Sequence, residues 1–358
     1  MADRHTFTYD ITINIFKKEV LTMKKFIKIV SVLLSLVITV FSFSACNKSE
    51  TTPSGKEKDS YKIGIIQYVS HPSLDNCYQG IMDAINASDL KDKITVDRQI
   101  GSDASADTDC ATYAKNMVAA QYDLILAIAT PAATSAYAAT TGTNIPVVFC
   151  AVNDPVAAEL VQSLEKPGDL CTGTSDVLDL DAQVKMIQKL QPDVKDIGIL
   201  YTTSESNSIS NLQRFKEICG QLNINVEAVG VQNASDIPSA ATSLAGKVDC
   251  INNFTDNNVV NNLSIVLDAA KTAGIPVYGS EVEQVKNGCL ASVSIDYVAL
   301  GKTTGDMALD VLKGADITTM SVKTIGEAST VINTDVLGAL NMKEPADIGT
   351  VEHVTTNK

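Results

Sequence analysis

Tryptophan is absent from this 358-residue chain, and only three histidines are present. His5 and His353 lie near the two ends, so His71 is the sole histidine in the body of the sequence. A histidine-rich metal site needs several such residues, and a Ser-His-Asp triad would have to use His71 without a GxSxG turn. We therefore predict that the protein is not an enzyme and binds no metal.

Complete nucleotide-binding motifs are also missing. The segment 296–303 reads DYVALGKT and resembles the end of GxxxxGK[ST], but Asp296 replaces the first glycine, where backbone amides must cradle phosphate. No GxGxxG follows the first expected strand, so we predict no dinucleotide and no other cofactor. The net charge of −14 and the lack of a basic stripe after residue 30 exclude a nucleic-acid partner, which needs clustered Lys and Arg.

Paired cysteine motifs are absent as well. None of the eight cysteines forms a CxxC pair, which excludes zinc ribbons and thioredoxin-like sites. Without Cys46 the number is seven, so a complete set of disulfides within one chain is excluded. We expect buried free thiols that act as small apolar side chains, with a single Cys150–Cys171 bridge as the alternative.

The N-terminal part contains a targeting segment. Residues 23–46 read MKKFIKIVSVLLSLVITVFSFSAC, in which lysines precede an uncharged apolar stretch and small residues precede Cys46. This pattern resembles the lipobox of bacterial lipoproteins, with Phe43 in place of the usual leucine. A membrane-spanning helix is the alternative, but the apolar stretch is short for one. We predict a signal peptide over 23–45, lipidation of Cys46 and attachment to the outside of the cell membrane.

Two segments flank this signal. Residues 1–22 are expected to be a spurious upstream extension, with Met23 as the translation start. Residues 46–60 contain the lipidated cysteine and a polar stretch, NKSETTPSGKEKDS, that has nothing to bury. This composition predicts a flexible tether between the lipid and the folded part.

From Tyr61 onward, expected strands and helices alternate regularly. Apolar strands such as KIGIIQYV (62–69) and DLILAIA (123–129) are each followed by a stretch of helical periodicity. The series restarts near residue 195 with IGILY (197–201). Alternation of this kind predicts an α/β fold with two Rossmann-like parallel-sheet lobes, covered by helices on both faces.

Polar residues follow the expected strands, where ligands bind in open α/β sheets. Each of them alone is explained equally well as a helix cap. Together they offer helix N-termini for a carboxylate and acidic groups for an ammonium, which points to an amino acid. The residues are His71, Thr130, Asn153, Asp154, Glu205, Asn207, Asp256, Asn257, Ser280, Glu281 and Asp296.

Most of the chain resembles the tryptophan/tyrosine-type substrate-binding proteins of ABC importers. The resemblance extends from Tyr61 to about Thr334. The segments that carry it are IGIIQYVSHPSLDNCYQGIMDAI (63–85), AIATPAATSAYAAT (127–140), IPVVFCAVNDPVAAELV (145–161), GTSD (173–176), ILYTTSESNS (199–208), FTDNNVV (254–260), IPVYGSE (275–281) and ASVSIDYVALGKTTGDMALDVLKG (291–314).

The resemblance implies a type I periplasmic-binding-protein fold, whose two lobes are joined by a three-stranded hinge. It places 61–176 and 297–325 in the first lobe, and 177–296 and 326–358 in the second. It also implies an aromatic amino acid or a related small ligand, partner permease and ATPase subunits, and a monomer. A sensory protein that presents a small molecule to a membrane receptor remains the alternative function.

Roles for the candidate residues follow from their chemistry. We expect Thr130, with the N–H groups of Ala132 and Ala133, to bind a carboxylate. An ammonium would meet Asp296 together with Glu281 or Asp154. Hydrogen bonds would come from Asn153, Asn207 and Asn257, and the side-chain pocket would be lined by Tyr68, His71, Tyr201 and Phe254. Asp176, Glu205, Asp256 and Ser280 complete the candidate set.

Overall fold

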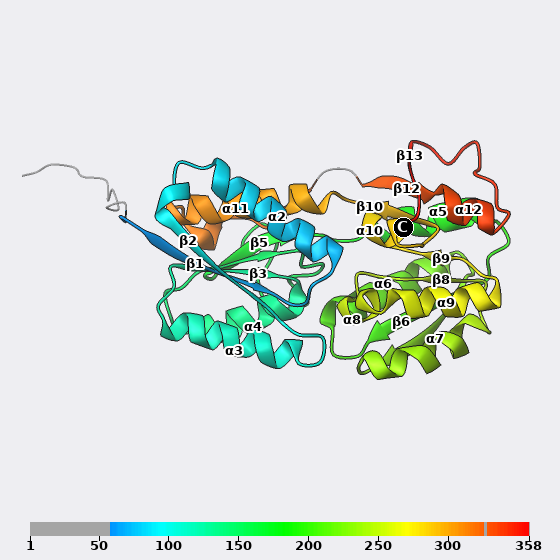
Figure 1. Cartoon of the computed structure of the whole chain (residues 1–358), viewed down its shortest axis with the longest axis horizontal. Coiled ribbons are helices and arrows are strands. Elements are labelled where there is room, and N and C mark those ends of the chain that lie inside the picture. The colour runs from blue at the N-terminus through cyan, green and yellow to red at the C-terminus, as the bar shows by residue number, and fades with distance from the viewer. Residues whose placement is uncertain (1–57, 326–327, 358) are drawn as a thin grey trace, which may run out of the picture. The chain divides into compact units, whose positions relative to one another are not determined.

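The computed structural model describes residues 58–325 and 328–357. The predicted extension (1–22), signal peptide (23–45), Cys46 and the tether up to residue 57 lie outside these residues. Two parallel sheets with covering helices form the described part, as Figure 1 shows, and confirm the predicted α/β fold. No described helix is both long and apolar enough to span a bilayer.

The first sheet is entirely parallel and has six strands. In spatial order they are β11 (Lys323–Thr324), β5 (Cys171–Ser175), β4 (Val147–Cys150), β3 (Leu124–Ile128), β1 (Tyr61–Gln67) and β2 (Ile94–Ile100). The helices packed on it are α2 (Pro72–Ala87), α3 (Ala106–Ala119), α4 (Thr130–Thr140) and α11 (Tyr297–Leu312).

Successive side chains of β1 point to opposite faces of this sheet, and both faces are buried. Ile63 and Ile65 join a core with α2 and α11, whereas Ile66 joins a core with α3 and α4. Burial on both sides explains why these strands are almost continuously apolar in the sequence. The helices α2 and α11 make especially close contact through glycines, among them Gly80 and Gly301.

The second parallel sheet has four strands. In spatial order they are β7 (Asn225–Val231), β6 (Asp196–Thr202), β8 (Cys250–Asn252) and β9 (Val277–Tyr278). Its helices are α5 (Leu180–Leu190), α6 (Ser206–Gln221), α7 (Ile237–Ala245), α8 (Asn257–Asn261), α9 (Leu263–Ala273) and α10 (Val282–Lys286). One core packs α5 and α6 against it, and another packs α7 and α9.

A small third sheet lies beside the second group of elements. Its strand β12 (Ser329–Asn333) pairs antiparallel with β10 (Ala291–Ser294) and parallel with β13 (Val351–Val354). A short helix, α12 (Thr334–Ala339), follows β12, and three 3-10 turns, η1 (Lys91–Lys93), η2 (Ala234–Asp236) and η3 (Ile317–Thr319), complete the fold.

The chain passes between the two sheet systems more than once. It leaves the first sheet after β5, returns between β10 and α11, and leaves again after β11. We use lobe 1 for residues 61–176 and 297–325, and lobe 2 for 177–296 and 328–357.

All seven cysteines of the described part are free and buried. This confirms the expectation of buried thiols, and Cys150 and Cys171 are not bridged. Burial raises the pKa of Cys110 and Cys219 to about 12, so these thiols stay protonated at neutral pH.

Candidate functional site

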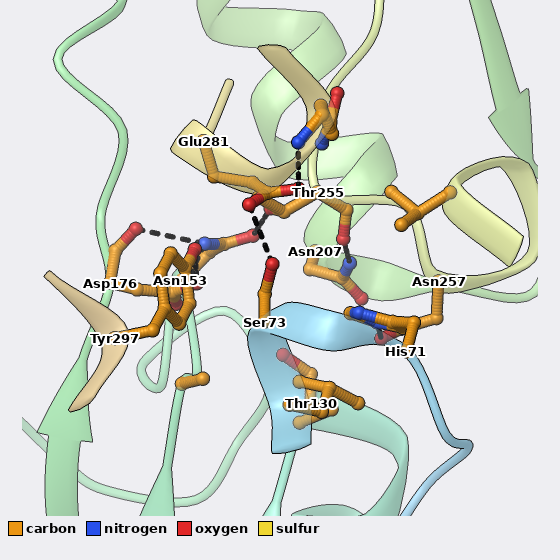
Figure 2. A pocket seen from close by; sticks show the side chains of 15 residues that line it. His71, Ser73, Thr130, Asn153, Asp176, Asn207, Thr255, Asn257, Glu281 and Tyr297 are labelled. Atoms are coloured by element: carbon orange, nitrogen blue, oxygen red, sulfur yellow. Dashed lines mark hydrogen bonds between the residues drawn. The ribbon is translucent and has the colours of Figure 1, made fainter. Parts of the chain in front are cut away.

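A small cavity lies between the lobes, at the carboxyl ends of the parallel strands (Figure 2). Ligands bind at this place in open α/β sheets. Lobe 1 contributes His71, Ser73, Leu74, Ala129, Thr130, Ala151, Asn153, Asp176 and Tyr297 to its lining. Lobe 2 contributes Asn207, Thr255, Asn257, Val260, Glu281 and Gln284.

Direct hydrogen bonds across the cavity join the two lobes. Ser73, in the first turn of α2, donates from Oγ to Oε2 of Glu281 at 2.6 Å. His71, the residue before α2, lies 3.3 Å through Nε2 from Oδ1 of Asn257. The start of α2 in lobe 1 is thereby linked to the starts of α10 and α8 in lobe 2.

Asn153 is a second point of contact between the lobes. Its Oδ1 accepts hydrogen bonds from Asn211 Nδ2 at 3.1 Å and Thr255 Oγ1 at 3.0 Å, both in lobe 2. Its neighbour Asp154 accepts a hydrogen bond from Ser210 Oγ at 2.7 Å. Residues just after β4 thus hold the start of α6 and the loop after β8.

Asp176 is a buried carboxyl at one side of the cavity. Its Oδ1 accepts a hydrogen bond from Asn153 Nδ2 at 2.8 Å, and its Oδ2 accepts one from Tyr297 OH at 2.8 Å. Burial raises the pKa of Asp176 to about 6, although both hydrogen bonds favour the ionised form. This carboxyl therefore gains from any positive charge brought into the cavity.

Glu281 is the second buried carboxyl of the lining. It caps α10 by accepting the backbone N–H groups of Glu283 and Gln284, and it also accepts the Ser73 hydroxyl. Burial raises the pKa of Glu281 to about 7 against these hydrogen bonds.

Glu205 lies behind the lining rather than in it. Its Oε2 accepts from Asn207 Nδ2 at 3.1 Å, and from Asn257 through both N and Nδ2, at 3.2 and 2.7 Å. Burial, together with the nearby carboxylate of Asp256, raises the pKa of Glu205 to about 8. Two cavity asparagines are thus oriented by a buried acid.

The balance of charge in the lining is negative. Asp176 and Glu281 are its ionisable acids, and none of the fifteen lining residues is Lys or Arg. Burial lowers the pKa of His71 to about 4, so its ring is neutral at physiological pH. No cluster of three or more potential metal ligands occurs within the described residues. An uncompensated acidic cavity of this kind suits a ligand that brings its own ammonium group.

Two alanines of the lining have unusual backbone conformations. Ala129, directly after β3, has φ = 80°, and Ala151, directly after β4, has φ = 56°. Non-glycine residues rarely adopt positive φ, and such strain gathers at functional sites. Both alanines lie where strands of lobe 1 reach the cavity.

The cavity brings together part of the residue set predicted from the sequence. The predicted residues that line it are His71, Thr130, Asn153, Asp176, Asn207, Asn257 and Glu281. Three further acids lie close to it in other roles. Glu205 orients the asparagines, Asp154 bonds Ser210 at the lobe contact, and Asp256 caps α8 while accepting hydrogen bonds from Thr202 and Ser208.

The remaining predicted residues lie outside the lining. Ala132 and Ala133 are buried in the core under α4, and the Ala133 N–H bonds Ala129 O. Tyr68 lines a separate pocket, Tyr201 packs against the core of lobe 2, and Phe254 is buried edge-on against Phe215 at 5.5 Å between ring centroids. Ser280 donates to Asn253 O, and Asp296 caps α11.

Several lining residues were missed by the sequence analysis. They are Ser73, Leu74, Ala129, Ala151, Thr255, Val260, Gln284 and Tyr297. Thr255 itself follows an expected strand but was not chosen as a site residue. Ser73 and Tyr297 lie within two residues of His71 and Asp296, so including the sequence neighbours of the predicted residues would have found them. Leu74 and Val260 lie three residues after His71 and Asn257, at the spacing that puts two side chains on one face of a helix.

Comparison with known proteins adds independent information. The family model of ABC transporter substrate binding proteins matches residues 62–352. A tyrosine-binding protein of Clostridioides difficile is 37% identical over an alignment of 325 residues, and the match covers 88% of this chain and 93% of that protein.

Two solved structures are also similar to this chain. The ABC domain of a Streptococcus pneumonia protein in complex with L-Trp is 36% identical with a TM-score of 0.78, and the match covers 82% of this chain and all of that one. The ligand-free, open structure of a substrate-binding protein with adhesive properties from Clostridium difficile is 35% identical with a TM-score of 0.63, covering 83% of this chain and all of that one.

These matches agree with the architecture described above. They confirm the type I periplasmic-binding-protein fold and the absence of enzymatic activity, because members of this family bind substrates and transform none. The chain belongs to the family of ABC transporter substrate-binding proteins, which work outside the cytoplasm.

Proposed function

We propose that this protein is the solute-binding lipoprotein of an ABC importer and that it captures an amino acid, of the aromatic class, between its two lobes. The observation that carries the proposal is the buried cavity in which Asp176 and Glu281 face a space without a protein cation. The ligands named for two relatives, tyrosine and L-Trp, support the aromatic class.

The two charged groups of an amino acid have separate partners in this proposal. The ammonium lies between Asp176 and Glu281, where it relieves the cost of burying two acids. The carboxylate lies near Thr130, at the start of α4, where the helix dipole favours negative charge. Asn153, Asn207 and Asn257 supply hydrogen bonds from both lobes.

Ligand capture then follows from the contacts between the lobes. A ligand that touches both lobes binds the closed form better than the open one, so it shifts the equilibrium toward closure. The hydrogen bonds from Ser73 to Glu281 and from Asn211 to Asn153 form only when the lobes approach. The closed protein, a monomer anchored through Cys46, delivers the ligand to permease and ATPase partners.

A thermal-shift screen of the purified full-length protein tests the ligand class. Twenty amino acids, nucleosides and simple sugars are compared at equal concentration. A ligand that binds only the folded state adds about 2.7 kcal/mol of stability at a hundredfold excess over its Kd. We expect the largest rise in melting temperature with an aromatic amino acid, and a rise with sugars alone would contradict the proposal.

The membrane anchor is tested separately through Cys46→Ser. We expect this variant to lose incorporation of a labelled fatty acid and to leave the membrane fraction, while ligand binding is retained. A variant that stays lipid-labelled would place the modification elsewhere. Uptake of the identified ligand by cells that lack the gene distinguishes an importer, for which uptake falls, from a sensory protein, for which it does not change.

A further inference from the structure

Two buried hydrogen-bond acceptors in the cavity lack a partner. They are Oδ1 of Asn207 and Nδ1 of His71, and neither has a hydrogen bond to any residue of the described chain. The exposed fractions are only 4% for Asn207 and 8% for His71. Buried polar atoms normally have partners, so such atoms in a binding cavity indicate where a ligand supplies them.

The other hydrogen bonds of the Asn207 side chain show that the atom without a partner is its amide oxygen. Its Nδ2 donates to Glu205 Oε2 at 3.1 Å and to the Thr255 carbonyl oxygen at 3.3 Å. A carbonyl oxygen can only accept, so the amide nitrogen must face it and Oδ1 must point the other way. The free atom of Asn207 is therefore an acceptor.

The same reasoning settles the tautomer of His71. Oε2 of Glu205 already accepts from Asn207 Nδ2 and from the backbone N–H of Asn257, so it faces Asn257 Nδ2 as an acceptor too, at 2.7 Å. Oδ1 of Asn257 is then the atom that faces the imidazole as an acceptor. Nε2 of His71 therefore carries the proton that it donates to Asn257. Burial lowers the pKa of His71 to about 4, so Nδ1 keeps a free lone pair at neutral pH.

Two aliphatic side chains also line the cavity that contains these acceptors. Leu74 and Val260 line the cavity one helical turn after His71 and Asn257. Figure 2 shows His71, Asn207 and Asn257 on one side of the pocket, and Asp176, Asn153 and Tyr297 on the opposite side. Neutral acceptors beside aliphatic walls suit a ring that carries one polar hydrogen, whereas an ammonium is better placed beside the acids.

We propose that Asn207 and His71 determine specificity by accepting a hydrogen bond from an N–H or O–H group on the ligand's side chain. The inference rests on the proposed function and deepens it, because it selects aromatic amino acids with a ring donor. The indole N–H of tryptophan and the phenol O–H of tyrosine meet this requirement. Phenylalanine fills the same space and leaves both acceptors desolvated and unpaired.

The size of the expected discrimination follows from that loss. A site built to hydrogen-bond a substrate group rejects the analogue that lacks it far more strongly than an apolar pocket rejects a missing methylene. We expect the better of L-Tyr and L-Trp to bind at least about 100-fold more tightly than L-Phe.

Calorimetric titration of the full-length protein with L-Tyr, L-Trp and L-Phe tests this. The variants His71→Phe and Asn207→Leu remove one acceptor each at similar volume. We expect each variant to weaken binding of the preferred ligand at least about tenfold while L-Phe binding is unchanged or stronger. Retained L-Phe binding also shows that the variant is folded and closes.

Thr130→Val is the matched control, because Thr130 faces the carboxylate that all three ligands share. This variant should weaken the binding of all three ligands by a similar factor. If the wild type binds L-Phe as tightly as the better of L-Tyr and L-Trp, the specificity proposal is overturned while the proposed function stands. An equal loss of all three ligands in His71→Phe and Asn207→Leu would overturn it too, by assigning the acceptors to the shared amino group. If none of the three amino acids binds the wild type, both the specificity proposal and the proposed function are overturned.

Discussion

At the scale of single residues, the cavity lining contains two buried acids and no lysine or arginine. Asp176 and Glu281 hold pKa values of about 6 and about 7 because they are buried, and their hydrogen bonds only partly offset that burial. An arriving ammonium favours their ionised forms. Ligand binding in the proposed mode is therefore linked to the release of protons.

This linkage gives a pH dependence with a definite sign. Below the pKa of the empty protein, binding must first remove a proton, so affinity is weaker there and rises as pH increases. We expect the affinity for the amino acid to rise between about pH 5 and pH 8 and then to level off. Titration calorimetry at four pH values measures it.

The double variant Asp176→Asn/Glu281→Gln provides the control. We expect it to bind about 10- to 100-fold more weakly at pH 8, with a nearly flat pH profile, because the charged hydrogen bonds are lost. A wild-type affinity that falls as pH rises would contradict the placement of the ammonium beside these acids.

At the scale of elements, helix caps and binding residues have the same sequence signature. Asp296 follows a strand, as the predicted site residues do, but it accepts the N–H groups of Val298 and Ala299 at 2.9 and 3.1 Å. Its side chain lies outside the cavity lining, whereas the next residue, Tyr297, is part of it.

The variant Asp296→Ala separates these two roles. Loss of the cap of α11 should lower the free energy of unfolding by about 1 kcal/mol, as for other N-cap residues. We expect ligand affinity to stay within about twofold of the wild type, since no cavity contact is removed. A strong loss of affinity in a stable variant would instead support the ammonium-binding role predicted from the sequence.

Close packing of α2 against α11 depends on glycine. A Cβ at Gly301 would lie 2.0 Å from the carbonyl oxygen of Cys77, and one at Gly80 would lie 2.0 Å from that of Val298. Backbone atoms cannot move aside as a flexible side chain does. The two helices carry Ser73 and Tyr297 at their N-terminal ends, so their packing also positions one wall of the cavity.

We expect Gly301→Ala to destabilise the protein by about 1–3 kcal/mol, the usual cost of overpacking. Gly220, near the end of α6, is the control because its exposed position has nothing within 4 Å of an added Cβ. Gly220→Ala should be neutral or stabilising by up to about 1 kcal/mol, since alanine favours helix. Urea denaturation measures both, and equal effects would contradict the close approach of the helices.

The sequence could predict positions along a strand better than directions of side chains. The carboxyl ends of parallel strands share one edge, so His71, Thr130, Asn153 and Asn257 were found without coordinates. Phe254 follows a strand in the same way but is buried against Phe215, because only tertiary packing decides which way its ring turns.

At the scale of the whole molecule, the chain matches a ligand-bound relative better than an open, ligand-free one. The TM-score is 0.78 against the L-Trp complex but 0.63 against the ligand-free, open structure, although identity and coverage are almost equal. Hydrogen bonds such as Asn261 Nδ2 to Asp103 Oδ1, at 2.7 Å, join the two lobes directly. Closure and the acidic cavity together make up the proposed binding mechanism.

Titration calorimetry of the full-length protein with L-Tyr and L-Trp at several temperatures tests this mechanism most directly. We predict one ligand per chain and a negative heat-capacity change, because closure buries apolar surface of both lobes together with the ligand. An absence of binding heat at every temperature, together with no thermal shift from any of the twenty amino acids, would contradict it.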